Sequence, residues 1–292
     1  DDKYLKAEYL NLEKLEFNKP SAYIDYLNEK ILIIRGNGKI YLLDNNKLNE
    51  VNSNIEDFIG SRAIVPEGLE MYLDNPFYRN AVRDLKVIDG TIYVVMNFQF
   101  QKESKFTTIV LSGSFEENNI NFEVFFNPNE YTIDIDKFDA SHSGGKIQKI
   151  NDQFFLAVPD YGDAVNFPQN MDSIFGKIVK IIDKNNYEIF TLGHRNPQGF
   201  LYIEENKKLF ATEHGPSGGD EINLIENNEN YGWPISSYGE DKWVKNKKHS
   251  DLGHKDPLIY WNDNPGISEI AYVPNKSKLP FSDRLVVASL SG

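Results

Sequence analysis

Ionisable side chains gather in three short stretches that are also rich in glycine and proline. His142 precedes two glycines, Arg195 and Asn196 lie within the sequence GHRNPQG, and the third stretch, EHGPSGGDEIN, spans 213–223. Glycine and proline between polar residues are typical of backbone that is bent to present groups, rather than of side chains that fill a core. We therefore expect the chemistry to lie on loops at strand ends.

His142 has the chemistry of a general base. A neutral imidazole titrates near physiological pH, so it can take a proton from a hydroxyl group while a hydride leaves the adjoining carbon. The strand expected from Lys146 would place His142 where the chain enters a sheet. A single histidine beside two glycines is, however, more often a structural or surface residue, so the sequence alone leaves both interpretations open.

Arg195 and Asn196 offer a guanidinium fork and an amide at adjacent positions. This pair suits a planar ligand that carries several carboxylates, because the fork makes two parallel hydrogen bonds with each carboxylate. The alternative is that Arg195 pairs with a carboxylate such as Glu213 and ties two loops together, since arginine ion pairs are common in scaffolds.

Oxygen ligands for a hard cation are available in the third stretch. Calcium binds carboxylates and backbone carbonyls, so the Gly215-Pro216 turn is a plausible cation site. The acidic pair Asp220-Glu221, taken alone, is more often a solvated face than a calcium site. His249 lies in the lysine-rich region 242–255, which we interpret as an exposed loop with no metal partner.

The segments GHRNPQG, EHGPSGGDEINLI, NYGWP and SYG resemble the signature of the glucose/sorbosone dehydrogenase family. Members of that family are soluble six-bladed β-propellers that bind pyrroloquinoline quinone and calcium and oxidise aldoses. The resemblance implies a catalytic role for His142 as general base. It implies cofactor contacts for three residues: Arg195, Asn196 and His214. It implies that the carbonyls of Gly215 and Pro216 hold the catalytic calcium, and that a structural calcium lies between Glu221, the carbonyl of Tyr231 and Asp241.

The sequence also departs from the family pattern. Ser141 stands where glucose-oxidising members have an aspartate, and residues 80–84 replace a glycine-rich segment that contributes a substrate-facing glutamine. Two functions therefore stay open. One is a quinoprotein sugar dehydrogenase that oxidises an aldose at C1 by hydride transfer to pyrroloquinoline quinone. The other is a non-catalytic propeller that binds carbohydrate or protein and keeps only the fold and a structural calcium site.

Short β-prone runs separated by turns predict the elements that position these residues. A hairpin is expected at 31–43, where Ile31–Ile34 and Lys39–Leu43 flank a turn with two glycines, and a second begins at Val82–Val87. Such units recur about every fifty residues without long helical segments, which predicts an all-β propeller. We expect one domain over 1–292, with 1–20 undecided, about five blades present, and the rest of a six-bladed ring missing after Gly292.

Composition narrows the class of partner. The net charge of −13 and the pI of about 4.9 argue against nucleic acid and anionic membrane surfaces. The chain has no cysteine, which excludes disulfides and thiolate chemistry, and no apolar run near the roughly 20 residues that a membrane span needs. The family resemblance implies a sugar substrate and a periplasmic or secreted location. The sequence identifies neither the sugar nor the electron acceptor.

Overall fold

The computed structural model describes residues 22–36, 38–59, 82–99, 106–130, 142, 144–240, 247–277, 279 and 281–291. Strands dominate this part of the chain, which confirms the predicted all-β class. The helical elements bounded there are short: α1 (Glu56–Ile59) and the 3-10 helix η3 (His249–Leu252). No helix among the described residues is long and apolar enough to cross a membrane. The expectation for 1–20 lies outside the described residues.

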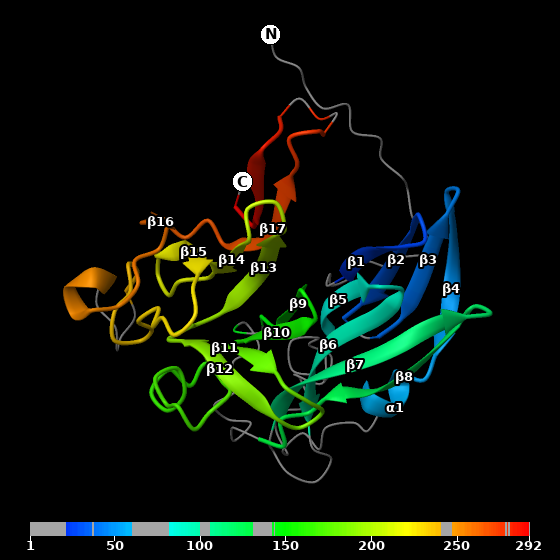
Figure 1. The fold of residues 1–292 in the computed structure, drawn as a ribbon, viewed down its shortest axis with the longest axis horizontal. Coiled ribbons are helices and arrows are strands. Elements are labelled where there is room, and N and C mark those ends of the chain that lie inside the picture. Colours follow the sequence, from blue (N-terminus) through cyan, green and yellow to red (C-terminus); the bar gives the residue numbers. More distant parts are fainter. Residues whose placement is uncertain are drawn as a thin grey trace, which may run out of the picture.

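The strands form successive antiparallel meanders (Figure 1). The first is β1 (Ala22–Leu27), β2 (Lys30–Arg35), β3 (Ile40–Asp44) and β4 (Lys47–Ser53). The second is β5 (Val82–Ile88), β6 (Thr91–Gln99), β7 (Phe106–Glu116) and β8 (Asn119–Phe126). The third is β9 (Lys146–Ile150), β10 (Gln153–Val158), β11 (Lys177–Ile181) and β12 (Tyr187–Leu192).

The fourth meander is β13 (Pro197–Ile203), β14 (Lys208–Glu213), β15 (Asp220–Ile225) and β16 (Ile259–Trp261). A fifth unit is described as the pair β17 (Ile267–Val273) and β18 (Arg284–Ser289). The outer strands β4 and β8 are joined by a short parallel pairing, so the first two meanders make one eight-stranded sheet.

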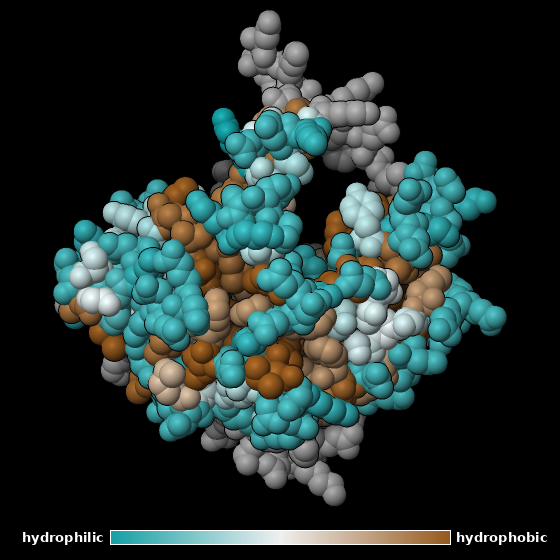
Figure 2. Space-filling model, viewed as in Figure 1, coloured by the Kyte–Doolittle hydropathy of each residue, from teal (hydrophilic) through white to brown (hydrophobic). Residues whose placement is uncertain are grey.

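The first strand of each unit lies toward a common centre. The strands β1, β5, β9, β13 and β17 pack side by side in that order (Figure 1). Radiating meanders around a shared centre are the arrangement of a β-propeller. Figure 2 shows an opening beside the β17–β18 pair, with hydrophobic residues visible between the sheets and hydrophilic residues over most of the outer surface.

The hydrophobic core lies between successive sheets. Leu32 and Ile34 of the first unit pack with Ile92 and Val94 of the second. Further clusters join the second unit to the third, the third to the fourth and the fourth to the fifth. Both sides of β2 are apolar: Leu32 and Ile34 face the second unit, while Ile33 clusters with Tyr41 of its own sheet, which explains the run Ile31–Ile34.

The predicted hairpins are confirmed, with Ile31 opposite Leu43 and Val87 opposite Ile92. The outer strand β4 has a mostly polar sequence, because its position leaves most of its side chains in solvent. One expectation was wrong. The acidic pair at 220–221 opens the strand β15 and is buried, rather than forming a solvated face.

Candidate functional site

A central cavity of about 980 Å³ is lined by residues of all five inner strands. The structure brings six of the nine predicted site residues to this one cavity: His142, Arg195, Asn196, His214, Gly215 and Pro216. Two of the others, Glu221 and Tyr231, lie in a smaller cavity behind the loop of Gly215. Asp241 lies outside the described residues. The predicted site residues therefore form two groups: six line the central cavity, and Glu221 and Tyr231 lie behind them.

His142 is held by a carboxylate that the sequence analysis missed. Its Nδ1 lies 2.7 Å from Oδ1 of Asp160, which is fully buried and follows the end of β10. Oδ1 also accepts the backbone N–H of Gly162 at 2.9 Å. Because a carboxylate only accepts hydrogen bonds, Nδ1 of His142 carries the proton and Nε2 carries the lone pair. A polar residue directly after a buried strand, next to a Tyr-Gly turn, is the signal that could have identified Asp160.

The lone pair of His142 faces Arg195. Nη2 of Arg195 lies 2.6 Å from Nε2 of His142, and Nη1 donates to the carbonyl of His214 at 3.0 Å. Arginine is a donor only, so the contact requires a neutral imidazole. The alternative, in which the Arg195 guanidinium pairs with Glu213, was wrong. Glu213 Oε2 accepts the backbone N–H of Arg195 at 3.0 Å, while the guanidinium contacts His142.

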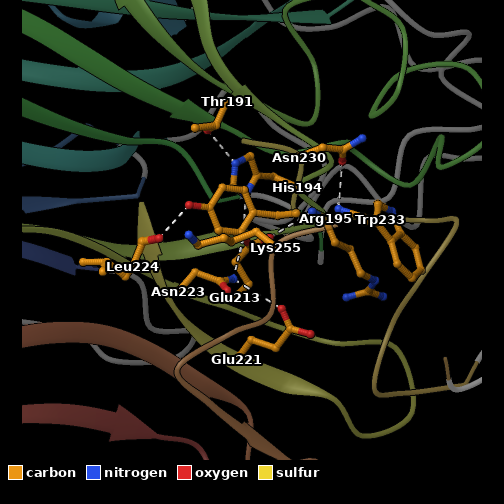
Figure 3. A network of polar contacts seen from close by, with 12 residues as sticks. Thr191, His194, Arg195, Glu213, Glu221, Asn223, Leu224, Asn230, Trp233 and Lys255 are labelled. Carbon is orange, nitrogen blue, oxygen red and sulfur yellow. Dashed lines mark hydrogen bonds and ion pairs between the residues drawn. The ribbon is translucent and has the colours of Figure 1, made fainter. Parts of the chain in front are cut away.

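A buried network fixes the backbone at Arg195 (Figure 3). The Thr191 hydroxyl oxygen lies 2.7 Å from Nε2 of His194, and Nδ1 of His194 donates to Glu213 Oε1 at 2.6 Å. Glu213 also accepts the side-chain amide of Asn223 at 3.2 Å. His194 is fully buried, and this network sets the direction in which the chain enters β13.

Asn196 ties the fourth unit to the third. Its Oδ1 accepts the backbone N–H of Gly144 at 2.8 Å. A Cβ on Gly144 would lie 1.9 Å from the carbonyl oxygen of Pro197, so only glycine permits this approach. The two chain segments that carry His142 and Arg195, which lead into β9 and β13, are thereby held together at the cavity.

Asp220 organises the loop of His214, Gly215 and Pro216. Its fully buried carboxylate accepts the backbone N–H of Gly215 at 2.9 Å, and those of Gly266 and Ile267 at 2.8 and 3.0 Å. Burial lowers the pKa of His214. The charge of Asp220 raises this pKa and the charge of Arg195 lowers it, and the net effect is a lowered pKa. The site therefore favours a neutral His214 beside a turn whose carbonyls have the chemistry of calcium ligands.

Glu221 contacts a histidine that the sequence analysis placed in an exposed loop. His249 is 2% exposed, and its Nε2 lies 3.3 Å from Glu221 Oε1. It stacks on Tyr238, with ring centroids 5.0 Å apart. Burial raises the pKa of Glu221. Burial by itself would lower the pKa of His249, but the hydrogen bond and charge of Glu221 outweigh burial, so the pKa of His249 is raised. The interpretation of His249 as exposed was wrong, because η3 folds back onto β15.

Tyr231 is anchored by its hydroxyl, which donates to the carbonyl of Leu224 at 2.6 Å, and its ring stacks on His194. Within the described parts of the chain, no group of three or more His, Cys, Asp or Glu side chains is arranged to hold a metal ion. The structural calcium between Glu221, Tyr231 and Asp241 therefore stays a prediction.

Comparisons with known proteins agree with this architecture. The sequence model of the family described as "Glucose / Sorbosone dehydrogenase" matches residues 18–292. The chain is 33% identical over 170 residues to aldose sugar dehydrogenase YliI of Escherichia coli, covering 52% of this chain and 46% of that protein. The matched segments span less than half of the length of the curated relatives.

Two solved structures show the same fold. One is the apo form of the soluble aldose sugar dehydrogenase of Escherichia coli, with a TM-score of 0.71 and 21% identity over 92% of this chain and 80% of that one. The other is the PQQ-bound form of aldose sugar dehydrogenase from Streptomyces coelicolor, with a TM-score of 0.59 and 19% identity over 84% of this chain and 68% of that one. Both similarities support the predicted β-propeller.

Proposed function

Because the chain belongs to the glucose/sorbosone dehydrogenase family, we propose that it is a quinoprotein sugar dehydrogenase that oxidises an aldose at C1 with pyrroloquinoline quinone and Ca²⁺. The observation that carries the proposal is the constellation of Asp160, His142 and Arg195 at the wall of the central cavity, with contacts of 2.7 and 2.6 Å. By the family resemblance, we also propose a periplasmic or secreted location.

The residues at the cavity fit the cofactor. A cavity of about 980 Å³ is large enough for a tricyclic quinone together with a sugar. Arg195, Asn196 and His214 would hold the quinone through a guanidinium, an amide and an imidazole. The carbonyls of Gly215 and Pro216 would hold Ca²⁺. The bound cofactor would supply the two-electron acceptor that takes the hydride from C1.

The residues of the chain supply the proton chemistry. Nε2 of His142 accepts the proton of the C1 hydroxyl, so that the C–O bond becomes a carbonyl as the C–H electron pair departs. Asp160 keeps the second ring proton on Nδ1 and stabilises the imidazolium that forms, because its buried carboxylate already accepts that N–H. The dyad thus fixes both the tautomer and the direction of the base.

Arg195 must leave Nε2 before the base can act. In the structure its Nη2 occupies the direction from which a hydroxyl proton would arrive. An anionic ligand beside Arg195 offers the guanidinium a stronger acceptor than a neutral imidazole, since charge-assisted hydrogen bonds are roughly twice as strong as neutral ones. Binding of a carboxylated cofactor and exposure of the base are therefore coupled in this proposal.

A non-catalytic propeller is the second candidate, favoured by one observation. The replaced segment of the second unit places Asp84, which is 2% exposed, against Lys146, whose Nζ also contacts Glu269 at 2.7 Å. This ion cluster occupies the cavity wall where the family resemblance implies a substrate-facing glutamine. If this ion cluster prevents the sugar from binding in the cavity, the protein would bind a different ligand or would not catalyse the reaction.

Reconstitution separates the two candidates. The protein is loaded with pyrroloquinoline quinone and Ca²⁺, and dye reduction is followed with several aldoses. Turnover that is lost in His142→Ala and kept in His254→Ala supports the dehydrogenase. A calorimetric titration without cofactor binding supports the non-catalytic propeller.

The structural calcium is tested separately. We propose that it lies at Glu221, the carbonyl of Tyr231 and Asp241, beside the buried Oδ1 of Asn223, which has no hydrogen-bond partner. Ca²⁺ should raise the thermal midpoint of the wild type, and the rise should shrink in Glu221→Gln. An equal rise in both proteins would place the ion elsewhere.

A further inference from the structure

We propose that Trp233 is a positioning residue for His142, an inference that rests on the proposed function. Trp233 lies in the sequence NYGWP, which the sequence analysis did not connect to the chemistry. Its indole N–H donates to Oδ2 of Asp160 at 2.8 Å, and the guanidinium of Arg195 lies over its ring, 5.3 Å from the centroid. Trp233 therefore contacts both groups that hold the imidazole.

The first of these contacts fixes the carboxylate. Oδ1 of Asp160 accepts His142 and the backbone of Gly162, while Oδ2 accepts the indole N–H. Asp160 is fully buried, and a buried carboxylate loses stability unless donors replace water. Because the indole N–H is a donor only, Oδ2 must accept and cannot carry a proton. The backbone N–H of Gly162 makes the same demand on Oδ1, so Oδ1 stays an acceptor for Nδ1 of His142.

The second contact fixes the cation. Attraction between a guanidinium and an aromatic face is strongest for tryptophan and grows when the pair is removed from water. Trp233 is 5% exposed, and Figure 3 shows Arg195 extending beside its ring. The ring thus limits the guanidinium to the region from which it reaches Nε2 of His142. One side chain sets the acceptor at Nδ1 and the donor at Nε2.

Trp233 is itself held rigidly between two units. Its backbone N–H donates to the carbonyl of Gly193 at 3.0 Å, and its carbonyl accepts the side-chain amide of Gln169 at 2.7 Å. Gln169 also exchanges two hydrogen bonds with Asn230, at 3.0 and 2.7 Å. A residue needed only to fill space could be phenylalanine, so the indole N–H is the part that serves the site.

The test removes this N–H and keeps the aromatic ring. In Trp233→Phe, we expect ¹⁵N spectra of the cofactor-free protein, labelled in histidine, to show that His142 gains a substantial Nε2–H population. In the reconstituted enzyme we expect kcat to fall 10- to 100-fold, while KM for the sugar changes less than 3-fold. Trp261→Phe, on β16, is the matched control and should leave both readouts unchanged.

The outcomes separate the two proposals. An unchanged His142 spectrum in a folded Trp233→Phe protein would overturn the positioning role, whatever happens to kcat. A changed spectrum in a protein that does not oxidise any aldose would keep the positioning role and remove the proposed function. If Trp233→Phe does not fold, benzothienylalanine at position 233 replaces the N–H by sulfur at nearly the same shape, and the same spectrum decides.

Discussion

Asp160→Asn tests how the structure holds its base, because it changes one buried oxygen to NH₂ at constant shape. Two orientations of the amide are available. With the amide nitrogen at the Oδ2 position, it faces the indole N–H of Trp233, and two donors oppose each other. With the nitrogen at the Oδ1 position, it faces the N–H of Gly162 and donates to Nδ1 of His142. The imidazole can accept that bond by moving its proton to Nε2, whereas the indole has no such option.

A loss of kcat is expected in both orientations. The first keeps the Nδ1–H tautomer but removes the negative charge that stabilises the imidazolium. The second, which also opposes the N–H of Gly162, disables the base twice. Nε2 becomes protonated, so it has no lone pair for the substrate hydroxyl, and its N–H opposes the guanidinium of Arg195. General-base catalysis contributes typically about 10²–10⁴-fold, which sets the expected loss of kcat. The lost hydrogen bonds to a charged, buried group should cost about 1.5–3 kcal/mol of folding stability.

Three measurements check this prediction: dye-linked kcat, the tautomer of His142 by ¹⁵N spectroscopy in cofactor-free protein, and the free energy of unfolding. The matched control is Asp163→Asn, three residues along, where the carboxylate accepts the backbone N–H of Asn166 at 3.1 Å. If Asp160→Asn keeps kcat within 3-fold of wild type, whichever tautomer His142 adopts, the assignment of the dyad is wrong.

Three further perturbations test other buried charges. Burial lowers the pKa of Lys177 from 10.5 to about 8, so between these pH values the unfolded chain keeps a proton that the folded protein releases. In denaturant titrations, the stability of wild type relative to Lys177→Met should therefore rise with pH, by about 3 kcal/mol in total, and a difference that does not change with pH would contradict this. Lys146→Met leaves the buried carboxylate of Asp84 without its cation and should cost about 3–5 kcal/mol, which a second change, Asp84→Asn, should largely restore; additive losses in the double variant would contradict the pairing. Asp220→Asn changes a carboxylate that accepts three backbone N–H groups, so it should lower both the thermal midpoint and the rise in that midpoint on adding Ca²⁺. A lower thermal midpoint with an unchanged rise on adding Ca²⁺ would show that this loop does not hold the cation.

Strands were predictable where burial on both faces imposes a continuous apolar run. Ile31–Ile34 is such a run, and its hairpin turn is marked by glycine. The first strand, β1, gives a weaker signal, because Asp25 interrupts its apolar run and Ile24 and Tyr26 are 66% and 68% exposed. The outer strand β4 is similar. In a radial fold the innermost and outermost strands lack a neighbour on one edge, so their sequences are freer.

The cavity residues were predictable from motif resemblance, but their partners were not. Asp160 follows His142 by 18 residues, and only the geometry of β9 and β10 brings the two together. His249 has lysines nearby in sequence, yet it is buried because Glu221 and Tyr238 meet it across β15 and η3. Buried polar pairs depend on contacts distant in sequence, whereas local composition reports only the neighbours along the chain.

The contacts that hold the site are concentrated at one junction between units. Asp160 of the third unit accepts Trp233 of the fourth and donates its backbone N–H to the carbonyl of Arg195 at 2.9 Å. Asn196 accepts Gly144 across the same junction. A base on one sheet and a cation on the next can keep a contact of 2.6 Å only if the two sheets cannot slide against each other. The hydrogen bonds across this junction therefore determine the geometry of the chemistry.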